Sequence, residues 1–188
     1  SIQQGQHTAI VGASGSGKTT LTQLLLGVWP PDKGGIYWQG KSYLAMDVEN
    51  IRKNISAMPQ GSVLFAKSIR ENFRILCPDL EESDMWQALQ DAQLDTVVKS
   101  MAQELDTPLG QDACDLSGGQ RSRLLTALAI AGAAPLIILD EPTCGLDKQR
   151  ASKLMESLWH RMKAREQTLV VITHEEELTK KFSQVIHL

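Results

Sequence analysis

The sequence contains few cysteines and has no large excess of either positive or negative charge. Its three cysteines, Cys77, Cys114 and Cys144, are widely spaced and form no C-x-x-C pair. This argues against a disulfide scaffold or a structural zinc site and fits a reducing cytosol. The 19 basic and 22 acidic residues are well mixed and leave a formal net charge of −3. That balance gives no support to nucleic-acid binding through bulk charge.

A long hydrophobic run is also missing. The most apolar stretch, 124–139, is shorter than the roughly 20 residues of a membrane span, and it contains Gly132 and Pro135. We interpret it as a helix, a turn and a buried strand. There is no signal-peptide pattern, internal repeat or low-complexity segment. The chain reaches an apolar strand soon after its first residue and stops inside another, QVIHL. We therefore expect one domain, 1–188, truncated at both ends from a longer polypeptide.

Strands and helices alternate along the chain. Apolar strands are predicted at Thr8–Val11, Gly35–Trp38, Ile55–Met58, Leu136–Leu139 and Thr168–Ile172. Helices are predicted from Lys18 to about Trp29, at Val48–Lys53, at Glu81–Ala92, from the glycine pair 118–119 to about Ala131, and at Lys148–Lys163. This alternation predicts an α/β fold with a mainly parallel sheet flanked by helices.

The stretch GASGSGKT, 12–19, lies between the first strand and the first helix. It matches G-x-x-x-x-G-K-[ST], whose glycines let main-chain N–H groups turn towards an anion at a helix N-terminus. Lys18 would neutralise the β- and γ-phosphates of a nucleotide, and the Thr19 hydroxyl would ligate Mg²⁺. The alternative is a flexible turn, which the immediate Lys and Thr disfavour. The predicted nucleotide-binding residues of this phosphate loop are Gly12, Ala13, Ser14, Gly15, Ser16, Gly17, Lys18, Thr19 and Thr20.

Acidic and imidazole side chains follow two other predicted strands. LIILDE places Asp140 and Glu141 at the exit of a buried strand. Beside a phosphate loop, one carboxylate can hold Mg²⁺ and the other can orient or deprotonate an attacking water. Alone, such a pair is usually only a polar strand end. His174 ends the strand LVVIT, and it is either a structural residue or a donor to a γ-phosphate at the edge where ligands of open α/β sheets bind.

A second glycine-containing helix start occurs at Ser117-Gly118-Gly119. It too is an anion-seeking helix N-terminus, yet one nucleotide does not need two cradles from one chain. The economical solution is a pair of domains, each of which lends this segment to the nucleotide of the other. The alternative is a simple N-cap formed by Ser117.

With these motifs in view, the sequence resembles the nucleotide-binding domains of ATP-binding-cassette (ABC) proteins. By resemblance, six stretches correspond in order to the Walker A, Q-loop, signature, Walker B, D-loop and switch-histidine motifs. They are GASGSGKT at 12–19, Gln60 in SAMPQ, LSGGQ at 116–120, LIILDE at 136–141, GLD at 145–147 and His174 in VVITH.

The resemblance implies a P-loop NTPase-type fold with a helical subdomain at about 74–131 and a partial antiparallel β subdomain. It also implies a head-to-tail dimer that encloses two ATP molecules and Mg²⁺. The residues implied in catalysis are Lys18, Gln60, Glu141 and His174. Those implied at the partner's nucleotide are Ser117, Gly118, Gly119, Gln120 and Asp147. Those implied as magnesium ligands are Thr19, Gln60 and Asp140. The aromatic residue on which the family stacks adenine lies upstream of Walker A, outside this chain.

Two stretches resemble the exporter branch of the family, SVLFAKSIREN and TPLGQDACDLSGGQ. The second departs from the exporter pattern at Gln111 and Ala113, and EPTCGLD departs from EATSALD. This branch implies an ATPase at the cytoplasmic face of a membrane, with transmembrane domains in the same full-length polypeptide. The alternatives are a soluble ABC ATPase acting on DNA or ribosomes, or a cassette that binds nucleotide without turnover. The members of the first class that act on chromosomes insert a very long coiled coil between Q-loop and signature, whereas Gln60 and Leu116 are only 56 positions apart here. The members that act in translation carry two cassettes and a distinctive linker in one chain, and the sequence shows neither.

Overall fold

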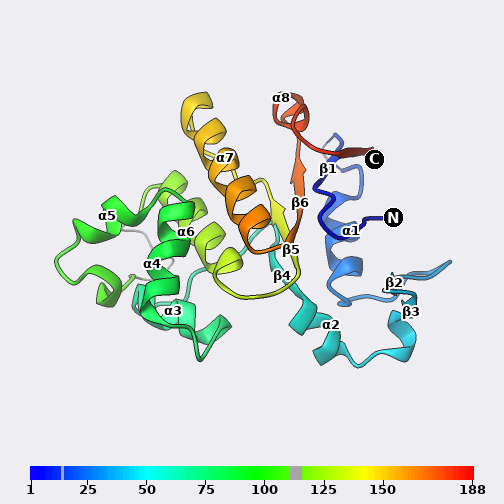
Figure 1. Cartoon of the computed structure of the whole chain (residues 1–188), viewed down its shortest axis with the longest axis horizontal. Coiled ribbons are helices and arrows are strands. Elements are labelled where there is room, and N and C mark those ends of the chain that lie inside the picture. The colour runs from blue at the N-terminus through cyan, green and yellow to red at the C-terminus, as the bar shows by residue number, and fades with distance from the viewer. Residues whose placement is uncertain (14, 111–115) are drawn as a thin grey trace. The chain divides into compact units, whose positions relative to one another are not determined.

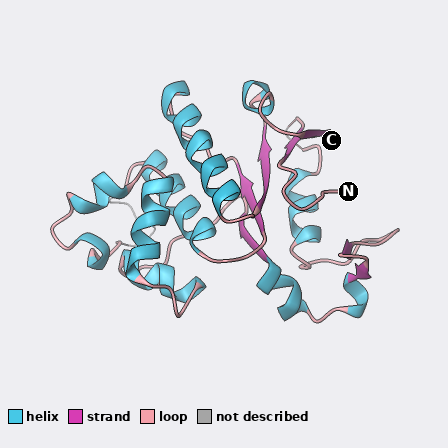
Figure 2. Ribbon diagram, in the orientation of Figure 1, coloured by secondary structure: helices cyan, strands magenta, loops and turns pink. Residues whose placement is uncertain are grey.

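The computed structural model describes residues 1–13, 15–110 and 116–188 (Figure 1). Two compact units are distinguished within the chain. The first consists of residues 1–60, 134–141 and 166–188, and the second of residues 61–133 and 142–165. Figure 2 shows that all strands belong to the first unit, whereas helices and loops make up the described part of the second.

The first unit is built on a five-stranded sheet with the strand order β4-β5-β6-β1-β7. Every neighbouring pair in this sheet is parallel, which confirms the predicted α/β fold. The strands are β1 (Thr8–Val11), β4 (Ile55–Met58), β5 (Leu136–Asp140), β6 (Thr168–Thr173) and β7 (Gln184–His187).

Continuous apolar sequence explains why the central strands form. All residues of β1, β5 and β6 are buried, as expected for central strands of a parallel sheet. Ile10, Ile138 and Ile172 belong to one hydrophobic cluster of this unit, against which Leu21 and Leu25 of the helix α1 (Lys18–Leu25) pack. The sheet core therefore positions α1, whose first residues, Lys18 and Thr19, complete the phosphate-loop motif.

The first helix ends earlier than predicted. It stops at Leu25 rather than near Trp29, because Gly27 adopts a positive φ of 65°. The Gly27 N–H bonds to the Leu24 carbonyl and the Val28 N–H bonds to the Gln23 carbonyl. A left-handed glycine with these two bonds is a common helix C-terminus.

The rest of the first unit is made of short elements. The helix α2 (Val48–Asn54) begins at Asp47, which caps it, and a 3₁₀ turn, η1, covers Tyr43–Ala45. The strands β2 (Tyr37–Trp38) and β3 (Lys41–Ser42) form a small antiparallel hairpin. The helix α8 (Glu176–Thr179) precedes β7.

The described elements of the second unit are helical. They are α3 (Ile69–Leu76), α4 (Glu82–Asp91), α5 (Asp95–Lys99), the 3₁₀ turn η2 (Glu104–Asp106), α6 (Gly118–Ala131) and α7 (Lys148–Ala164). The sequence analysis did not predict α3, although Ser68 and Glu71 form a capping box at its start, a recognisable sequence signal. In the described part of the chain, no helix combines the length and apolarity needed to span a bilayer.

Candidate nucleotide-binding site

The phosphate loop joins β1 to α1 in a conformation that glycine permits. Gly15 and Gly17 have φ values of 82° and 98°, in a region that residues with a Cβ rarely adopt. Gly17 is the N-cap of α1, and among the described residues no side chain caps this helix. The N–H groups of its first turn are therefore not covered by a side-chain cap and face the position where an anion would bind. Ser14 lies outside the described residues.

Glycine is needed at position 12 because neighbouring atoms leave no space for a Cβ, and not because the backbone adopts a positive φ there. A Cβ at this position would lie 2.5 Å from Ser16 Oγ and 2.9 Å from the Leu188 carbonyl. Within the described part of the chain, the buried Ser16 Oγ has no hydrogen-bond partner. A buried hydroxyl normally has a partner, so this orphan atom fits a loop shaped for a phosphate oxygen.

Lys18 is folded over the same loop. Its Nζ donates hydrogen bonds to the carbonyls of Gly12 at 2.6 Å and Ala13 at 2.8 Å. Two carbonyl oxygens thus hold the Lys18 side chain at the phosphate loop, where it supplies a positive charge. Thr20 follows in the first turn of α1, where it is exposed.

The three predicted magnesium ligands offer oxygen atoms of the kind that Mg²⁺ prefers. The Thr19 hydroxyl donates to Gln60 Oε1 at 3.2 Å, so two of the three are adjacent. Asp140 is buried at the end of β5. Burial raises the pKa of Asp140 and the nearby Glu141 charge raises it too, while a main-chain hydrogen bond from Gln60 and the Lys18 charge lower it. The donor set therefore fits magnesium.

Glu141 and His174 form an ion-pair geometry at the ends of β5 and β6. His174 Nδ1 lies 2.6 Å from Glu141 Oε1, and the His174 N–H donates to the same oxygen at 3.1 Å. The Thr173 hydroxyl donates to Glu141 Oε2 at 3.3 Å. The hydrogen bond and the charge of Glu141 raise the pKa of His174. The structure thus brings together two residues that the sequence placed 33 positions apart.

The predicted signature segment begins the helix α6 in the second unit. Ser117 is its N-cap: Ser117 Oγ accepts from the Gln120 N–H, and Gln120 Oε1 accepts from the Ser117 N–H. This capping box confirms the N-cap interpretation of Ser117. The capping box is compatible with the other interpretation, in which Ser117 contacts the nucleotide of a second domain, because a hydroxyl that accepts one hydrogen bond still has its own O–H to donate.

The two glycines of the signature have different surroundings. Among the described residues, a Cβ added to Gly118 would meet no atom within 4 Å, whereas one added to Gly119 would lie 3.1 Å from the Gly145 carbonyl and 3.2 Å from Leu146 Cδ2. Gly119 therefore permits a close approach of the loop that carries GLD. In that loop, Asp147 is the N-cap of α7 and accepts from the Arg150 N–H at 2.9 Å, so its carboxylate has a structural partner in its own helix.

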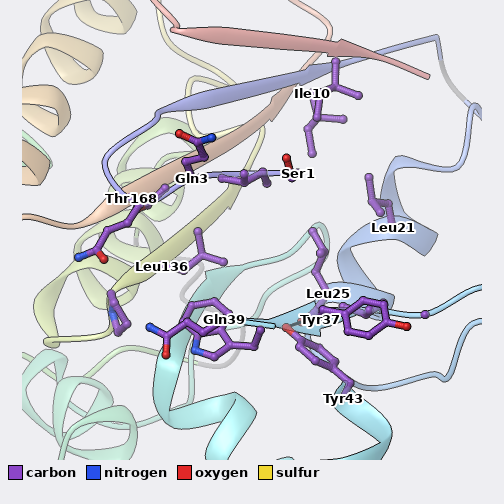
Figure 3. Close-up of a pocket in the computed structure, with 17 residues that line it drawn as sticks. Ser1, Gln3, Ile10, Leu21, Leu25, Tyr37, Gln39, Tyr43, Leu136 and Thr168 are labelled. Atoms are coloured by element: carbon purple, nitrogen blue, oxygen red, sulfur yellow. Dashed lines mark hydrogen bonds between the residues drawn. The ribbon is translucent and has the colours of Figure 1, made fainter. Parts of the chain in front are cut away.

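A separate apolar pocket of about 560 Å³ lies in the first unit. Figure 3 shows Leu21 and Leu25 from α1 beside Tyr37 and Tyr43, and the Tyr43 hydroxyl donates to the Leu25 carbonyl at 3.1 Å. None of the predicted site residues that the structure describes lines this pocket. The sequence analysis did not find it, because it is assembled from segments as distant as Ser1 and Ile186.

Comparison with known proteins extends the match of motifs to the whole chain. The relatives include the glutathione/L-cysteine transport system ATP-binding/permease protein CydC of Escherichia coli, which is 34% identical over 98% of this chain and 32% of its own length. They also include the ATP-dependent lipid A-core flippase of Ralstonia nicotianae, 37% identical over 92% of this chain and 29% of its own length. The chain therefore spans about a third of the length of these two relatives.

A solved structure gives the same assignment at the level of the fold. A bacterial Atm1-family ABC exporter with ATP bound superposes with a TM-score of 0.91 and 26% identity, over 100% of this chain and 32% of that one. The family model for ABC transporters matches residues 1–144, a range that contains the phosphate loop, Gln60, the signature and the Asp140–Glu141 pair. The resemblance seen in the sequence is therefore confirmed, and the chain belongs to the ABC transporter family.

Proposed function

We propose that this chain is the ATP-binding and ATP-hydrolysing domain of a membrane exporter. The observation that carries the proposal is the Glu141–His174 pair in the same unit as the phosphate loop. A chain that only bound nucleotide would need the loop but would have no use for a positioned carboxylate. The relatives named as a transport system and a flippase support transport over a soluble role on DNA or ribosomes.

The phosphate loop would bind the nucleotide. The uncapped N–H groups at the start of α1 would donate to phosphate oxygens, and Lys18 would exchange its two carbonyl partners for the β- and γ-phosphates. Thr19, Gln60 and Asp140 would hold Mg²⁺, which when bound neutralises charge on the phosphates. Ser16 Oγ, orphaned among the described residues, would gain a partner in the same step.

Glu141 would act as the general base. Both of its carboxylate oxygens already accept hydrogen bonds, from His174 and Thr173, which fixes the direction in which the remaining lone pairs point. A water held there would lose its proton to Glu141 as it attacks the γ-phosphorus. His174 would keep the carboxylate in place and offer a donor to the transferred phosphoryl group.

The proposed partner is a second nucleotide-binding domain, identical or related, bound head to tail. Ser117, Gly118, Gly119 and Gln120 would then meet the nucleotide held by the partner's loop. Two features support this: the Ser117 hydroxyl accepts one hydrogen bond as the N-cap and keeps an O–H that can donate, and no described atom lies within 4 Å of a Cβ added at Gly118. The transmembrane domains of the full-length polypeptide are the other proposed partner, at the cytoplasmic face of the membrane. Exposed apolar side chains of the second unit support such docking, namely Val63, Phe65, Ile75 and Leu76.

Steady-state ATP hydrolysis by the full-length protein tests the reaction. Glu141→Gln should bind ATP as the unchanged protein does and lose nearly all turnover, by about 100-fold or more, because general-base catalysis contributes on that order. Glu49→Gln, the same substitution at an exposed position of α2, should leave turnover unchanged. Turnover of Glu141→Gln near that of the control would remove Glu141 from the role of base.

Linked heterodimers test the head-to-tail arrangement. Gly118→Asp is the better probe than a change at Gly119, because only Gly118 has open space for a side chain. One half carries Gly118→Asp and the other carries Lys18→Ala. If each nucleotide lies between the phosphate loop of one domain and the signature of the other (a trans arrangement), one site has both defects and the other has neither. One intact site then remains. If Gly118→Asp alone abolished ATP binding by its own domain, the trans arrangement would be wrong.

A further inference from the structure

The first turn of α6 faces a conflict between function and helix stability. Two consecutive glycines begin the helix, and each is about 1 kcal/mol poorer than alanine in a helix. Neither glycine contributes a side chain that could hold the turn. The turn that carries the proposed nucleotide contacts must therefore be kept in place by other residues.

Arg123 ties this turn to the segment between α4 and α5. Its Nε donates to the Gly119 carbonyl at 3.2 Å and its Nη1 donates to the Gln93 carbonyl at 2.5 Å. One rigid guanidinium thus joins the signature glycine to the turn between α4 and α5. Arginine suits this task because its donors project in a fixed planar fork.

The second anchor point is itself rigid. Gln93 adopts a positive φ of 57°, and its N–H bonds to the Gln90 carbonyl at the end of α4. Its neighbours Ala92 and Leu94 are fully buried. A backbone held on both sides by core residues offers its carbonyl at a fixed position, so Arg123 connects the glycine turn to the core of the unit.

Another arginine reaches the same segment from α7. Arg161, buried, donates to the Ile130 carbonyl near the end of α6 through Nε at 3.1 Å and Nη2 at 2.6 Å, and pairs with Asp91. The segment 91–93 is therefore bonded by both guanidinium groups: Arg161 of α7 joins Asp91 to the Ile130 carbonyl in the last turn of α6, and Arg123 of α6 joins the Gln93 carbonyl to the Gly119 carbonyl in the first turn. The two arginines differ in what they hold: Arg161 anchors the far end of α6, and Arg123 anchors the end with the glycines.

We propose that Arg123 is a positioning residue for ATP turnover, which holds the Gly118–Gly119 turn in the geometry needed at the partner's nucleotide. The inference rests on the proposed function and deepens it, since it names a residue that acts through Gly119 without touching ATP. Loss of Arg123 should disturb catalysis in the dimer and leave nucleotide binding by the chain's own phosphate loop intact.

The test compares three variants of the full-length protein. Arg123→Met keeps the aliphatic stem and removes both hydrogen bonds, Arg123→Lys keeps the charge without the fork, and Arg74→Met removes an exposed arginine at the end of α3 as the matched control. For Arg123→Met we expect kcat to fall about tenfold, which corresponds to about 1.4 kcal/mol, with an unchanged dissociation constant for a fluorescent ATP analogue. The kcat of Arg123→Lys should lie between those of Arg123→Met and the unchanged protein. The kcat of Arg74→Met should equal that of the unchanged protein.

Amide hydrogen exchange gives a readout that needs no ATPase activity. In nucleotide-free protein, exchange in peptides covering 117–123 should be about tenfold faster in Arg123→Met, while peptides from α4 keep their protection. If Arg123→Met does not fold, the same two measurements on Arg123→Lys decide. Unchanged kcat and unchanged exchange would overturn the positioning role. If the unchanged protein does not hydrolyse ATP, the proposed function fails, and the exchange result still shows whether Arg123 holds the turn.

Discussion

The helices α1 and α6 both begin at a glycine-containing segment, but their N-termini are built in opposite ways. The N-cap of α1 is Gly17, which offers no side chain, and the helix end has no side-chain cap. The N-cap of α6 is Ser117, which forms a capping box with Gln120. The difference teaches how one sequence signal, small residues before a helix, produces two kinds of site. An uncapped end presents main-chain donors for its own ligand, whereas a capped end is complete in the free chain and presents a hydroxyl and bare backbone.

The largest contrast should appear in nucleotide binding. Lys18→Ala removes the ammonium group that faces the loop and should weaken ATP binding about 100-fold, on the order of 3 kcal/mol for lost charge-assisted hydrogen bonds. Ser117→Ala should leave the affinity of the same chain for ATP unchanged. Titration of each nucleotide-free variant with a fluorescent analogue measures both. Equal losses in the two variants would mean that the two helix ends serve one nucleotide of the same chain.

The two signature glycines should respond to alanine with opposite signs. Gly119→Ala places a methyl group 3.1 Å from the Gly145 carbonyl and should destabilise the fold by about 1–3 kcal/mol, as overpacking does. Gly118→Ala has open space and should stabilise it by about 0.5–1 kcal/mol through helix propensity. Thermal unfolding of the pair provides the comparison. A loss of stability at Gly118 as large as that at Gly119 would contradict the close approach described for Gly119.

The serines of the two segments should differ more modestly. Ser117→Ala removes the N-cap of α6 and should cost about 1 kcal/mol of unfolding free energy. Ser16→Ala removes a buried hydroxyl that lacks a partner among the described residues, so it should be neutral within about 0.5 kcal/mol or slightly stabilising. Chemical denaturation of both variants measures the difference, and an equal cost at Ser16 would show that its hydroxyl is bonded in the free protein.

The smallest expected effect is the titration of His174. Its pKa is raised by the hydrogen bond and charge of Glu141, so the folded state binds this proton more tightly than the unfolded state does. The stabilisation is then fully present below the unfolded pKa of about 6.5 and is lost as pH rises through the raised folded pKa. NMR titration of the imidazole in nucleotide-free protein should show the raised value, and Glu141→Gln should bring it back towards about 6.5. If Glu141→Gln left the pKa of His174 unchanged, Glu141 would not be the cause of the raised pKa.

Sequence information was sufficient where a feature depends on neighbours along the chain. The strand Ile55–Met58 was predicted with its observed bounds, and the end of α6 was predicted at about Ala131, where the structure places it, because an apolar run and a following glycine mark them locally. The phosphate loop is likewise a contiguous pattern. The end of α1 was wrong, because an apolar residue on either side of Gly27 hid a left-handed C-terminus.

Contacts that join distant segments could not be predicted. The bonds from Arg123 to Gly119 and Gln93 depend on how α6 packs near the end of α4, and no spacing in the sequence reports that packing. The approach of Gly119 to Gly145 has the same origin. The Glu141–His174 pair was suggested by two strand ends at one sheet edge, but only the structure gives its distance. The roles of the individual site residues in binding and turnover stay predictions.

Glu141 is one of the described non-glycine residues with a positive φ, 52°. A side chain in that region strains the backbone by on the order of 1 kcal/mol, and glycine would relieve this strain. Replacement of Glu141 by glycine should therefore relieve this backbone strain, while it removes the proposed base and the hydrogen bonds from His174 and Thr173. At this position the requirement for a carboxylate in catalysis and the relief of backbone strain favour different residues. In a copy of the domain that no longer needs to hydrolyse ATP, only the backbone preference for glycine and the hydrogen bonds of the carboxylate would decide which residue is kept.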